Sequence, residues 1–591
     1  MESDDEDSVD IMVYRPSKHE VGDSFKILNL CLQKNDITTD HYKYREMIKI
    51  QIKQGTLAGV QKLLPNGKPF NSFQGIPYAK PPVGSLRFKS PVALKQFDVQ
   101  ELDCSKERDI SHHRDPFLQK IVGSENCLHL NVYAPQSANE KQLPVMVWIH
   151  GGAFWFGSGN SDSFYPLKLI EHDVVVVTIN YRLGALGFLS LPEEGIYGNA
   201  GLKDQRLALQ WVQENIAKFN GDPNNVTIFG QSAGAISVHM HSYADHANKY
   251  FHKVIMQSGT ANMEWSFQSN PGYKTRKLAK LLGCESNKTS DILTFLQSDA
   301  VTADRILLSS PCVLTEDERR RGLPVPFKPV VEDKNSPDIF IKKPILESLL
   351  KINVVKVPTI MGYNSTDGLA LLSNALRKLN AIDNDLERFV PRDIPLPVDS
   401  PGIKAIAKEM RNFYFKGGII NEKSLNELAN VLSDYHFVVD MQRAAECQAR
   451  YQSNAPLFFY RFNYIGDHNM YKRIFQFEAL NGACHGDELC YMFQTAGDKA
   501  TLAPDDEIFA NKLCQLWTNF AKYGKPTTDD AVNWKPVTCP KTEDSEFELD
   551  YLSIDKQFEM KKNPEENRMN FWRKIYQNYN RIDYSRLSAK L

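Results

Sequence analysis

Residues 226–243 read VTIFGQSAGAISVHMHSY, and this stretch decides the fold prediction. The apolar run Val226–Phe229 predicts a buried strand, and Ala235–Tyr243 is able to form a helix. Between them, Gly230–Gly234 fits the pattern G-x-S-x-G, whose small residues let the chain turn sharply from strand to helix. Such a turn exposes the hydroxyl of Ser232 and aims a helix N-terminus at it, which favours developing negative charge. We therefore predict that Ser232 is a nucleophile; the alternative is a glycine-rich turn with an incidental serine.

Strand patterns alternate with helical patterns along most of the chain. Alternation of Ile48, Ile50 and Ile52 with polar neighbours indicates a half-buried strand, whereas continuous apolar runs indicate strands buried on both faces. The segment Asp204–Phe219 has a mostly apolar face and predicts a helix. The predicted strands lie at residues 47–52, 128–132, 144–149, 174–179, 225–230, 253–257, 357–362 and 457–462. This alternation predicts an α/β fold around one large sheet.

The chain has 591 residues, a length that by itself suggests about four domains of ordinary size. It contains no internal repeat and no long low-complexity linker, so the charged stretch 286–338 and the proline-rich stretch 391–401 are interpreted as excursions from one domain. We predict a poorly ordered acidic segment at 1–45, one domain at 46–580 and a tail at 581–591.

Charge and composition exclude several classes of protein. The 70 Lys and Arg residues against 72 Asp and Glu residues give a net charge of −2, which offers no attraction for nucleic acid or a membrane surface. Ten cysteines are too few for a disulfide scaffold, and no Cys or His cluster has metal-ligand spacing, so we expect no metal and no cofactor. Apolar stretches such as Val174–Val177 are far shorter than the roughly 18 residues that span a bilayer.

The ends of the sequence favour an intracellular protein. The first ten residues, MESDDEDSVD, have neither the positive start nor the apolar core of a secretory signal. We therefore expect a cytoplasmic location. The final Ala589-Lys590-Leu591 is a relaxed form of the Ser-Lys-Leu address, so the peroxisome is the alternative.

A second glycine-rich segment follows a predicted buried strand. The sequence HGGAF at 150–154 can bring backbone N–H groups close to a substrate oxygen, because glycine permits unusual dihedral angles and close approach. We expect the N–H groups of Gly152 and Ala153 to form an oxyanion hole together with that of Ala233. Taken alone, HGGAF would be read as a turn that leaves a strand.

A serine nucleophile needs a base and an acid to orient the base. Among fourteen histidines, His485 lies in NGACHGDEL, whose glycines suit an exposed loop at a sheet edge. Asp367 follows the strand predicted at 357–362, and the carboxyl ends of strands carry the active loops of α/β sheets. Glu332 and Asp333 remain the rivals for the acid.

Many ordered motifs are shared with one known family. They are QGIPYA at 74–79, RF at 87–88, ENCLHLNV at 125–132, HGGAF at 150–154, NYRLG at 180–184, GNAGLKDQ at 198–205, GQSAGA at 230–235, MQSG at 256–259 and HGDEL at 485–489. On these motifs the chain resembles the cholinesterase/carboxylesterase (type B) family of α/β-hydrolases over residues 45–575. The resemblance implies a single α/β-hydrolase domain whose large central, mostly parallel sheet is flanked by helices.

The resemblance also carries functional residues onto this chain. It implies the catalytic triad Ser232, Asp367 and His485. It likewise implies an oxyanion hole of three backbone N–H groups, from Gly152, Ala153 and Ala233.

Several residues depart from the family pattern. Asp367 stands where glutamate is usual, and Ala153 stands where glycine is commoner. Cholinesterases have glutamate where this chain has Gln231. They also have a tryptophan that binds quaternary ammonium by a cation–π interaction, and the equivalent stretch between Cys104 and Cys127 contains no tryptophan. A choline ester is therefore not expected as the substrate. The resemblance implies a disulfide between Cys104 and Cys127, with a reduced pair as the alternative in a cytosolic protein.

These features lead to one expected function and three alternatives. We expect a serine carboxylesterase that hydrolyses apolar esters, lipid-like or xenobiotic, through an acyl-enzyme intermediate, as the insect intracellular α-esterases that it resembles do in detoxification. The alternatives are a juvenile-hormone-type esterase, a non-catalytic adhesion or scaffold protein, and a protein that sequesters esters or organophosphates. The expected partner is a small-molecule ester, and no oligomeric state is predicted.

Overall fold

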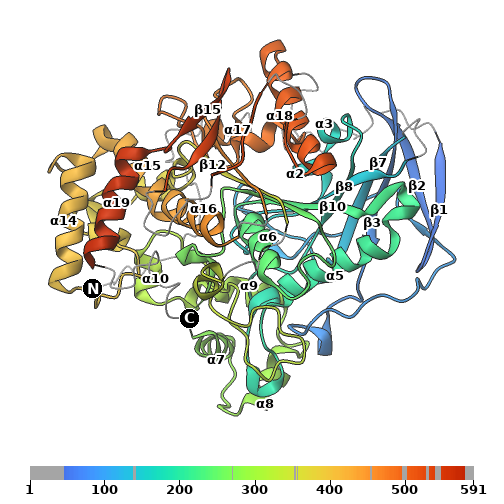
Figure 1. The fold of residues 1–591 in the computed structure, drawn as a ribbon. Helices are drawn as coiled ribbons and strands as arrows, with labels where there is room; N and C mark the ends of the chain where they lie inside the picture. The colour runs from blue at the N-terminus through green and yellow to red at the C-terminus, as the bar shows by residue number, and fades with distance from the viewer. Residues whose placement is uncertain are drawn as a thin grey trace.

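The computed structural model describes residues 46–136, 141–268, 270–351, 355, 357–452, 455–495, 502–527, 532–538 and 547–579. The predictions for residues 1–45 and 581–591 lie outside the described residues. One large sheet runs through the described part, with helices packed against both of its faces (Figure 1). The predicted fold class is confirmed.

The sheet contains thirteen strands in the described part of the chain, in the order β1-β2-β3-β7-β9-β8-β10-β11-β12-β13-β14-β15, with β4 paired to β2. The strands are β1 Met47–Ile52, β2 Gly55–Leu63, β3 Pro69–Pro77, β4 Glu101–Asp103, β7 His129–Pro135, β8 Leu143–Ile149, β9 Val175–Ile179, β10 Gly221–Gln231, β11 Lys253–Gln257, β12 Thr359–Asn364, β13 Leu457–Phe462, β14 Asp550–Ile554 and β15 Phe558–Lys562. A separate pair consists of β5 His113–Arg114 and β6 Ile121–Val122.

Strand direction divides the sheet into a parallel centre and antiparallel edges. Each adjacent pair in the series β9, β8, β10, β11, β12, β13, β14 is parallel, and at one edge the short β4 is parallel to β2. The pairs β1–β2, β2–β3, β3–β7, β7–β9 and β14–β15 are antiparallel. The sheet is therefore mostly parallel at its centre, as expected when helices cross over between strands.

Helices surround the sheet, some packing against its two faces and others on neighbouring helices. They are α2 Ser161–Phe164, α3 Leu167–Ile170, α4 Gly184–Phe188, α5 Ala200–Asn215, α6 Ala233–Tyr243, α7 Pro271–Leu282, α8 Thr289–Leu296, α9 Ala303–Ser309, α10 Glu316–Arg320, α11 Ile345–Leu349, α12 Leu369–Leu376, α13 Leu379–Asp383, α14 Pro401–Phe415, α15 Leu425–Ser433, α16 Val439–Tyr451, α17 Met470–Ile474, α18 Pro504–Tyr523 and α19 Glu566–Tyr579. Side chains of β8 alternate between two cores: Val147 joins the core on one face, whereas Trp148 joins the core on the other. This alternation explains why the central strands read as continuous apolar runs.

The structure corrects the start of one predicted helix. Helix α5 begins at Ala200, not at Asp204, and ends at Asn215, where a 3₁₀ turn at Ile216–Phe219 follows. The first turns of α5 carry buried polar side chains, and the carboxylate of Asp204 pairs with the guanidinium of Arg182 at 2.7 Å. Buried polar residues hide the apolar face on which the sequence pattern depends.

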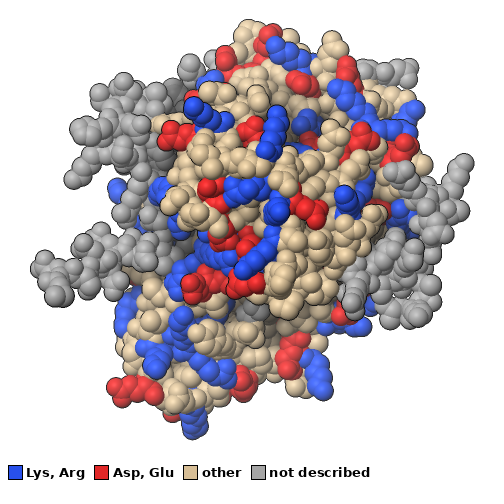
Figure 2. All heavy atoms as spheres, turned by 90° about the vertical axis from the view of Figure 1, so that its left-hand side faces the viewer, with Lys and Arg blue, Asp and Glu red and all other residues tan. Residues whose placement is uncertain are grey.

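The face of the molecule shown in Figure 2 carries charges of both signs. Figure 2 shows the side of the molecule with α14 and α19, where basic and acidic side chains are interspersed. No helix among the described residues is long and apolar enough to cross a membrane.

Candidate active site

Ser232 lies on the sharp turn between β10 and α6. Its φ of +58° and ψ of −125° belong to a region that serine rarely adopts, so the surrounding structure must hold it there. Its N–H donates to the carbonyl of Gln257 at 2.8 Å, at the end of β11. A Cβ atom on Gly234 would lie 2.0 Å from the carbonyl oxygen of Ile149, so only glycine fits at this position. The G-x-S-x-G pattern is thus a requirement of close packing at this turn.

His485 and Asp367 form a hydrogen-bonded pair. Nδ1 of His485 lies 2.8 Å from Oδ1 of Asp367, which is completely buried at the end of β12. Oδ2 of Asp367 accepts from the hydroxyl of Ser258 at 3.0 Å and from the N–H of Asn364 at 3.2 Å. Since all of these partners donate, the carboxylate orients the imidazole with Nδ1–H toward Asp367 and leaves Nε2 as the acceptor.

The end of β11 links the acid to the serine. Gln257 accepts the N–H of Ser232 through its carbonyl, and the next residue, Ser258, holds Asp367 through its hydroxyl. The hydrogen bonds of the described residues do not include one between Ser232 and His485. Bonds of this kind are often long until a substrate is bound.

The rival carboxylates are occupied elsewhere. Glu332 is buried and accepts from the ammonium of Lys203 at 2.7 Å, from the side chain of Asn199 at 3.0 Å and from the N–H of Phe340 at 2.8 Å. Asp333 is exposed. The geometry therefore favours Asp367 as the partner of His485.

The predicted oxyanion donors lie in left-handed or helix-terminal backbone. Gly152 has φ +100° and Ala153 has φ +55°, while Ala233 is the first residue of α6. The structure gives none of the three N–H groups an acceptor within the described parts of the chain. A Cβ atom built on Gly151 would lie 3.1 Å from Cβ of Ser232, so this segment passes directly beside the serine. Three unpaired donors beside a strained serine are able to bind a developing oxyanion.

Three residues near the site carried no predicted role. Ser258 lies in the MQSG motif, but its hydrogen bond to Asp367 is revealed only by the structure. Glu488 is fully buried and accepts from the side chains of Gln257 and Asn364; burial and the charge of Asp367 raise its pKa to about 7. The ring of Phe437 packs on His485, with ring centroids 4.6 Å apart. No local sequence signal marks Phe437, because the contact depends on the tertiary fold.

The model of the carboxylesterase family matches residues 46–572. The chain belongs to the carboxylesterase family. The prediction of a carboxylic ester hydrolase is confirmed at the level of this family.

Relatives of this carboxylesterase-family chain include several insect esterases. It is 32% identical over 550 residues to a carboxylic ester hydrolase of Bombus ignitus, covering 90% of this chain and 95% of the relative. It is 34% identical over 522 residues to a juvenile hormone esterase of Tribolium castaneum, covering 84% and 86%. A crystal structure of juvenile hormone esterase from Manduca sexta, with OTFP covalently attached, superposes with a TM-score of 0.79 at 28% identity, covering 90% of this chain and all of that one.

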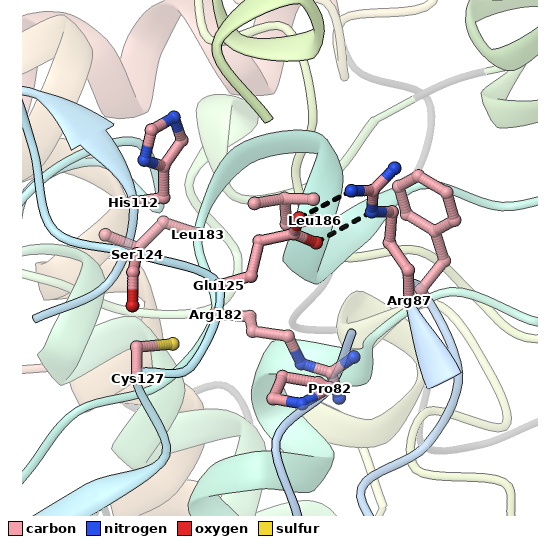
Figure 3. A pocket seen from close by; sticks show the side chains of 10 residues that line it. Pro82, Arg87, His112, Ser124, Glu125, Cys127, Arg182, Leu183 and Leu186 are labelled. Atoms are coloured by element: carbon pink, nitrogen blue, oxygen red, sulfur yellow. Dashed lines mark hydrogen bonds and ion pairs between the residues drawn. The ribbon is translucent and has the colours of Figure 1, made fainter. Parts of the chain in front are cut away.

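Some family motifs serve to hold the fold together. Figure 3 shows a tightly filled pocket in which the guanidinium of Arg87 forms a two-pronged ion pair with Glu125, with Nε 2.7 Å and Nη2 2.5 Å from the carboxylate oxygens. Nη1 of Arg87 also donates to the carbonyls of Leu296 and Val301. Ser232 and His485 do not line this pocket. We therefore assign the RF and ENCL motifs a structural role, in tying distant loops together.

The implied disulfide is absent from this structure. Cys104 and Cys127 are buried free thiols, and burial raises the pKa of each to about 12. Both thiols therefore stay protonated and unreactive at neutral pH.

Proposed function

We propose that the chain is a serine carboxylesterase that hydrolyses apolar carboxylic esters through an acyl-enzyme on Ser232. The observation that carries this proposal is the His485–Asp367 pair at 2.8 Å, joined through Ser258 to the strand end that holds the strained serine. Family membership supports the reaction class.

The arrangement supports a two-step reaction. Nε2 of His485 takes the proton of Ser232 as Oγ attacks the ester carbonyl, and Asp367 stabilises the imidazolium. The N–H groups of Gly152, Ala153 and Ala233 hold the oxyanion, and His485 then returns the proton to the leaving alcohol. Water, deprotonated by His485, attacks the acyl-enzyme and releases the acid.

The surroundings of Ser232 favour a neutral, apolar ester. The residue before the nucleophile is the uncharged Gln231, and the segment after the predicted oxyanion donors continues with the buried rings of Phe154 and Trp155. On the other side the ring of Phe437 covers His485. Such a site suits lipid-like or xenobiotic esters, and hence a role in detoxification.

Hydrolysis of p-nitrophenyl esters tests this proposal. We expect turnover by the wild type, and about a 10⁴-fold loss of kcat in Ser232→Ala without loss of folding. Wild-type protein that takes up one acyl group per chain and does not release it would instead favour the sequestering alternative. A Ser232→Ala variant with wild-type turnover would overturn the proposal.

A juvenile-hormone-type esterase is the second candidate. Likeness to a juvenile hormone esterase in both sequence and structure favours it. We expect kcat/KM for juvenile hormone to lie below that for simple aryl esters in this chain; a value higher by tenfold or more would make the second candidate the better description.

An intracellular setting forms part of the proposal. It is supported by the free thiols of Cys104 and Cys127. When protein from its natural source is unfolded in denaturant without reductant, an alkylating reagent should label both cysteines. If neither cysteine is labelled, the two form a disulfide, which would point to an oxidising compartment.

A further inference from the structure

A π-helical turn lies next to the candidate active site. Helices α15 and α16 form one nearly continuous run that is interrupted by the π turn Asp434–Val438. Within it the N–H of Val439 donates to the carbonyl of Asp434, five residues earlier. The turn inserts one extra residue into the helix, and such insertions are frequently found at functional sites.

The π turn places an aromatic ring on His485. Phe437 is 2% exposed, and its ring lies 4.6 Å from the imidazole, centroid to centroid, with 34° between the ring planes. The face of a benzene ring carries partial negative charge, so it attracts a cation that lies over it. The ring is therefore placed to interact with His485 most strongly when the imidazole is protonated.

The same helical run also packs on the acid. Gly368 directly follows Asp367, and its N–H donates to the hydroxyl of Ser433 at 2.9 Å, at the end of α15. A Cβ atom on Gly368 would lie 2.4 Å from the carbonyl oxygen of Ala429 and 2.5 Å from the nitrogen of Ser433. Because backbone touches backbone here, the loop that carries Asp367 and the turn that carries Phe437 are fixed relative to each other.

Contacts remote from His485 hold the π turn in place. The indole N–H of Trp265 donates to the carbonyl of His436 at 3.0 Å. The hydroxyl of Tyr414 donates to the carboxylate of Asp434 at 2.6 Å, and the indole of Trp572 donates to that hydroxyl at 2.8 Å. The position of the Phe437 ring is therefore set by the fold and does not depend on the imidazole.

We propose that Phe437 is a positioning residue for His485, whose ring fixes the plane of the imidazole and stabilises the imidazolium formed during ester hydrolysis. This inference rests on the proposed function, since it requires that His485 takes up a proton in the reaction. It assigns the π turn a specific task in the chemistry.

Other ionisable groups near His485 must be considered before a pH effect is assigned to the ring. Asp367 bonds to the imidazole, and Glu488, whose pKa burial raises to about 7, lies close enough to interact with His485. Burial raises the pKa of the neighbouring Cys484 thiol. On the π turn, burial raises the pKa of Asp434 to about 6 and lowers that of His436 to about 3. Substitutions at position 437 leave all five of these groups in place. A comparison among variants at this position therefore measures the effect of the aromatic ring alone.

The test compares Phe437→Leu, Phe437→Tyr and the control Phe389→Leu in pH–rate profiles with a p-nitrophenyl ester. Phe389 is a buried ring that packs on Tyr435 of the same turn and belongs to neither the triad nor the oxyanion segment. Without the ring face the imidazolium is less stable, so Phe437→Leu should lower kcat by about two- to thirtyfold and move the acid limb of the profile to lower pH. Phe437→Tyr keeps the ring and should restore both quantities, while Phe389→Leu should leave the acid limb unmoved.

Two results would overturn the inference. One is an unmoved acid limb in folded Phe437→Leu; the other is a Phe437→Tyr variant that behaves like Phe437→Leu. Failure of the proposed function is distinguishable, because it would appear as activity retained in Ser232→Ala, whatever the variants at 437 do.

Discussion

At the scale of the residue, hydrogen bonds to His485 and Ser258 distinguish Asp367 from its rivals Glu332 and Asp333. Both of its oxygens accept hydrogen bonds at the site, one from His485 and the other from Ser258 and Asn364. The sequence predicted Ser232 and His485 from motifs with a local cause; it favoured Asp367 as the acid but kept Glu332 and Asp333 as rivals. All three carboxylates occupy plausible loops, and only the tertiary fold shows which one meets the imidazole.

The acid assignment is tested by matched carboxylate-to-amide changes. Asp367→Asn should lower kcat by about 10⁴-fold, because the amide no longer holds the imidazole in the required tautomer or stabilises its cation. Glu332→Gln should leave the kcat of the folded enzyme near wild type but reduce the free energy of unfolding by about 3–5 kcal/mol, since it weakens the buried pair with Lys203. Steady-state kinetics and denaturant unfolding measure the two effects. A kcat loss with Glu332→Gln alone would reverse the assignment.

At the scale of elements, the turn from β10 to α6 positions Ser232, the proposed nucleophile. Two buried central strands, β11 and β13, begin and end where their apolar runs do, whereas β12 lies two residues later than its predicted range of 357–362. The start of β10 at Gly221 could not be predicted, because residues 221–225 contain no apolar run. Gly221 pairs with Leu143 beyond an irregularity in the pairing of β10 with β8. The start of α5 was hidden in the same way by its buried polar residues.

A glycine substitution tests the packing of the turn. Gly234→Ala would place a methyl group 2.0 Å from the carbonyl oxygen of Ile149, so the turn must shift. We expect esterase activity to fall by more than tenfold and the thermal unfolding midpoint to drop. In the control Gly272→Ala, on α7, the added methyl group meets only the flexible end of Arg276, so activity and stability should stay near wild type. Equal behaviour of the two variants would contradict this account of the turn.

At the scale of the whole molecule, the site depends on segments far apart in the sequence. Residues around 232, 367 and 485 meet at the carboxyl ends of parallel strands. The last described helix, α19, packs beside α14 (Figure 1), and Arg568 of α19 pairs with Asp434 of the π turn. Alternating strand and helix patterns predicted this single sheet. They could not predict the attachment of α19, which rests on buried side-chain contacts between distant segments.

The anchor of α19 offers a test at this scale. Trp572 is 1% exposed, and its indole supports the hydroxyl of Tyr414 that bonds to Asp434 of the π turn. Trp572→Ala should lower the free energy of unfolding by about 3–5 kcal/mol, because it leaves a cavity and frees the C-terminal helix. Lys574→Ala, an exposed change on the same helix, should lie within about 0.5 kcal/mol of wild type. Denaturant unfolding measures both values. Equal free energies of unfolding for Trp572→Ala and Lys574→Ala would refute the proposed anchor.

Covalent labelling of Ser232 tests the central claim most directly. Wild type and Ser232→Ala are incubated with a phosphorylating inhibitor, and the intact mass of each chain is measured together with residual esterase activity. We predict one adduct per wild-type chain, located at Ser232 by peptide mapping, with loss of activity in proportion to labelling, and no adduct on Ser232→Ala. Equal labelling of the two proteins, or full activity in a fully labelled wild type, would contradict the assignment of Ser232 as the nucleophile.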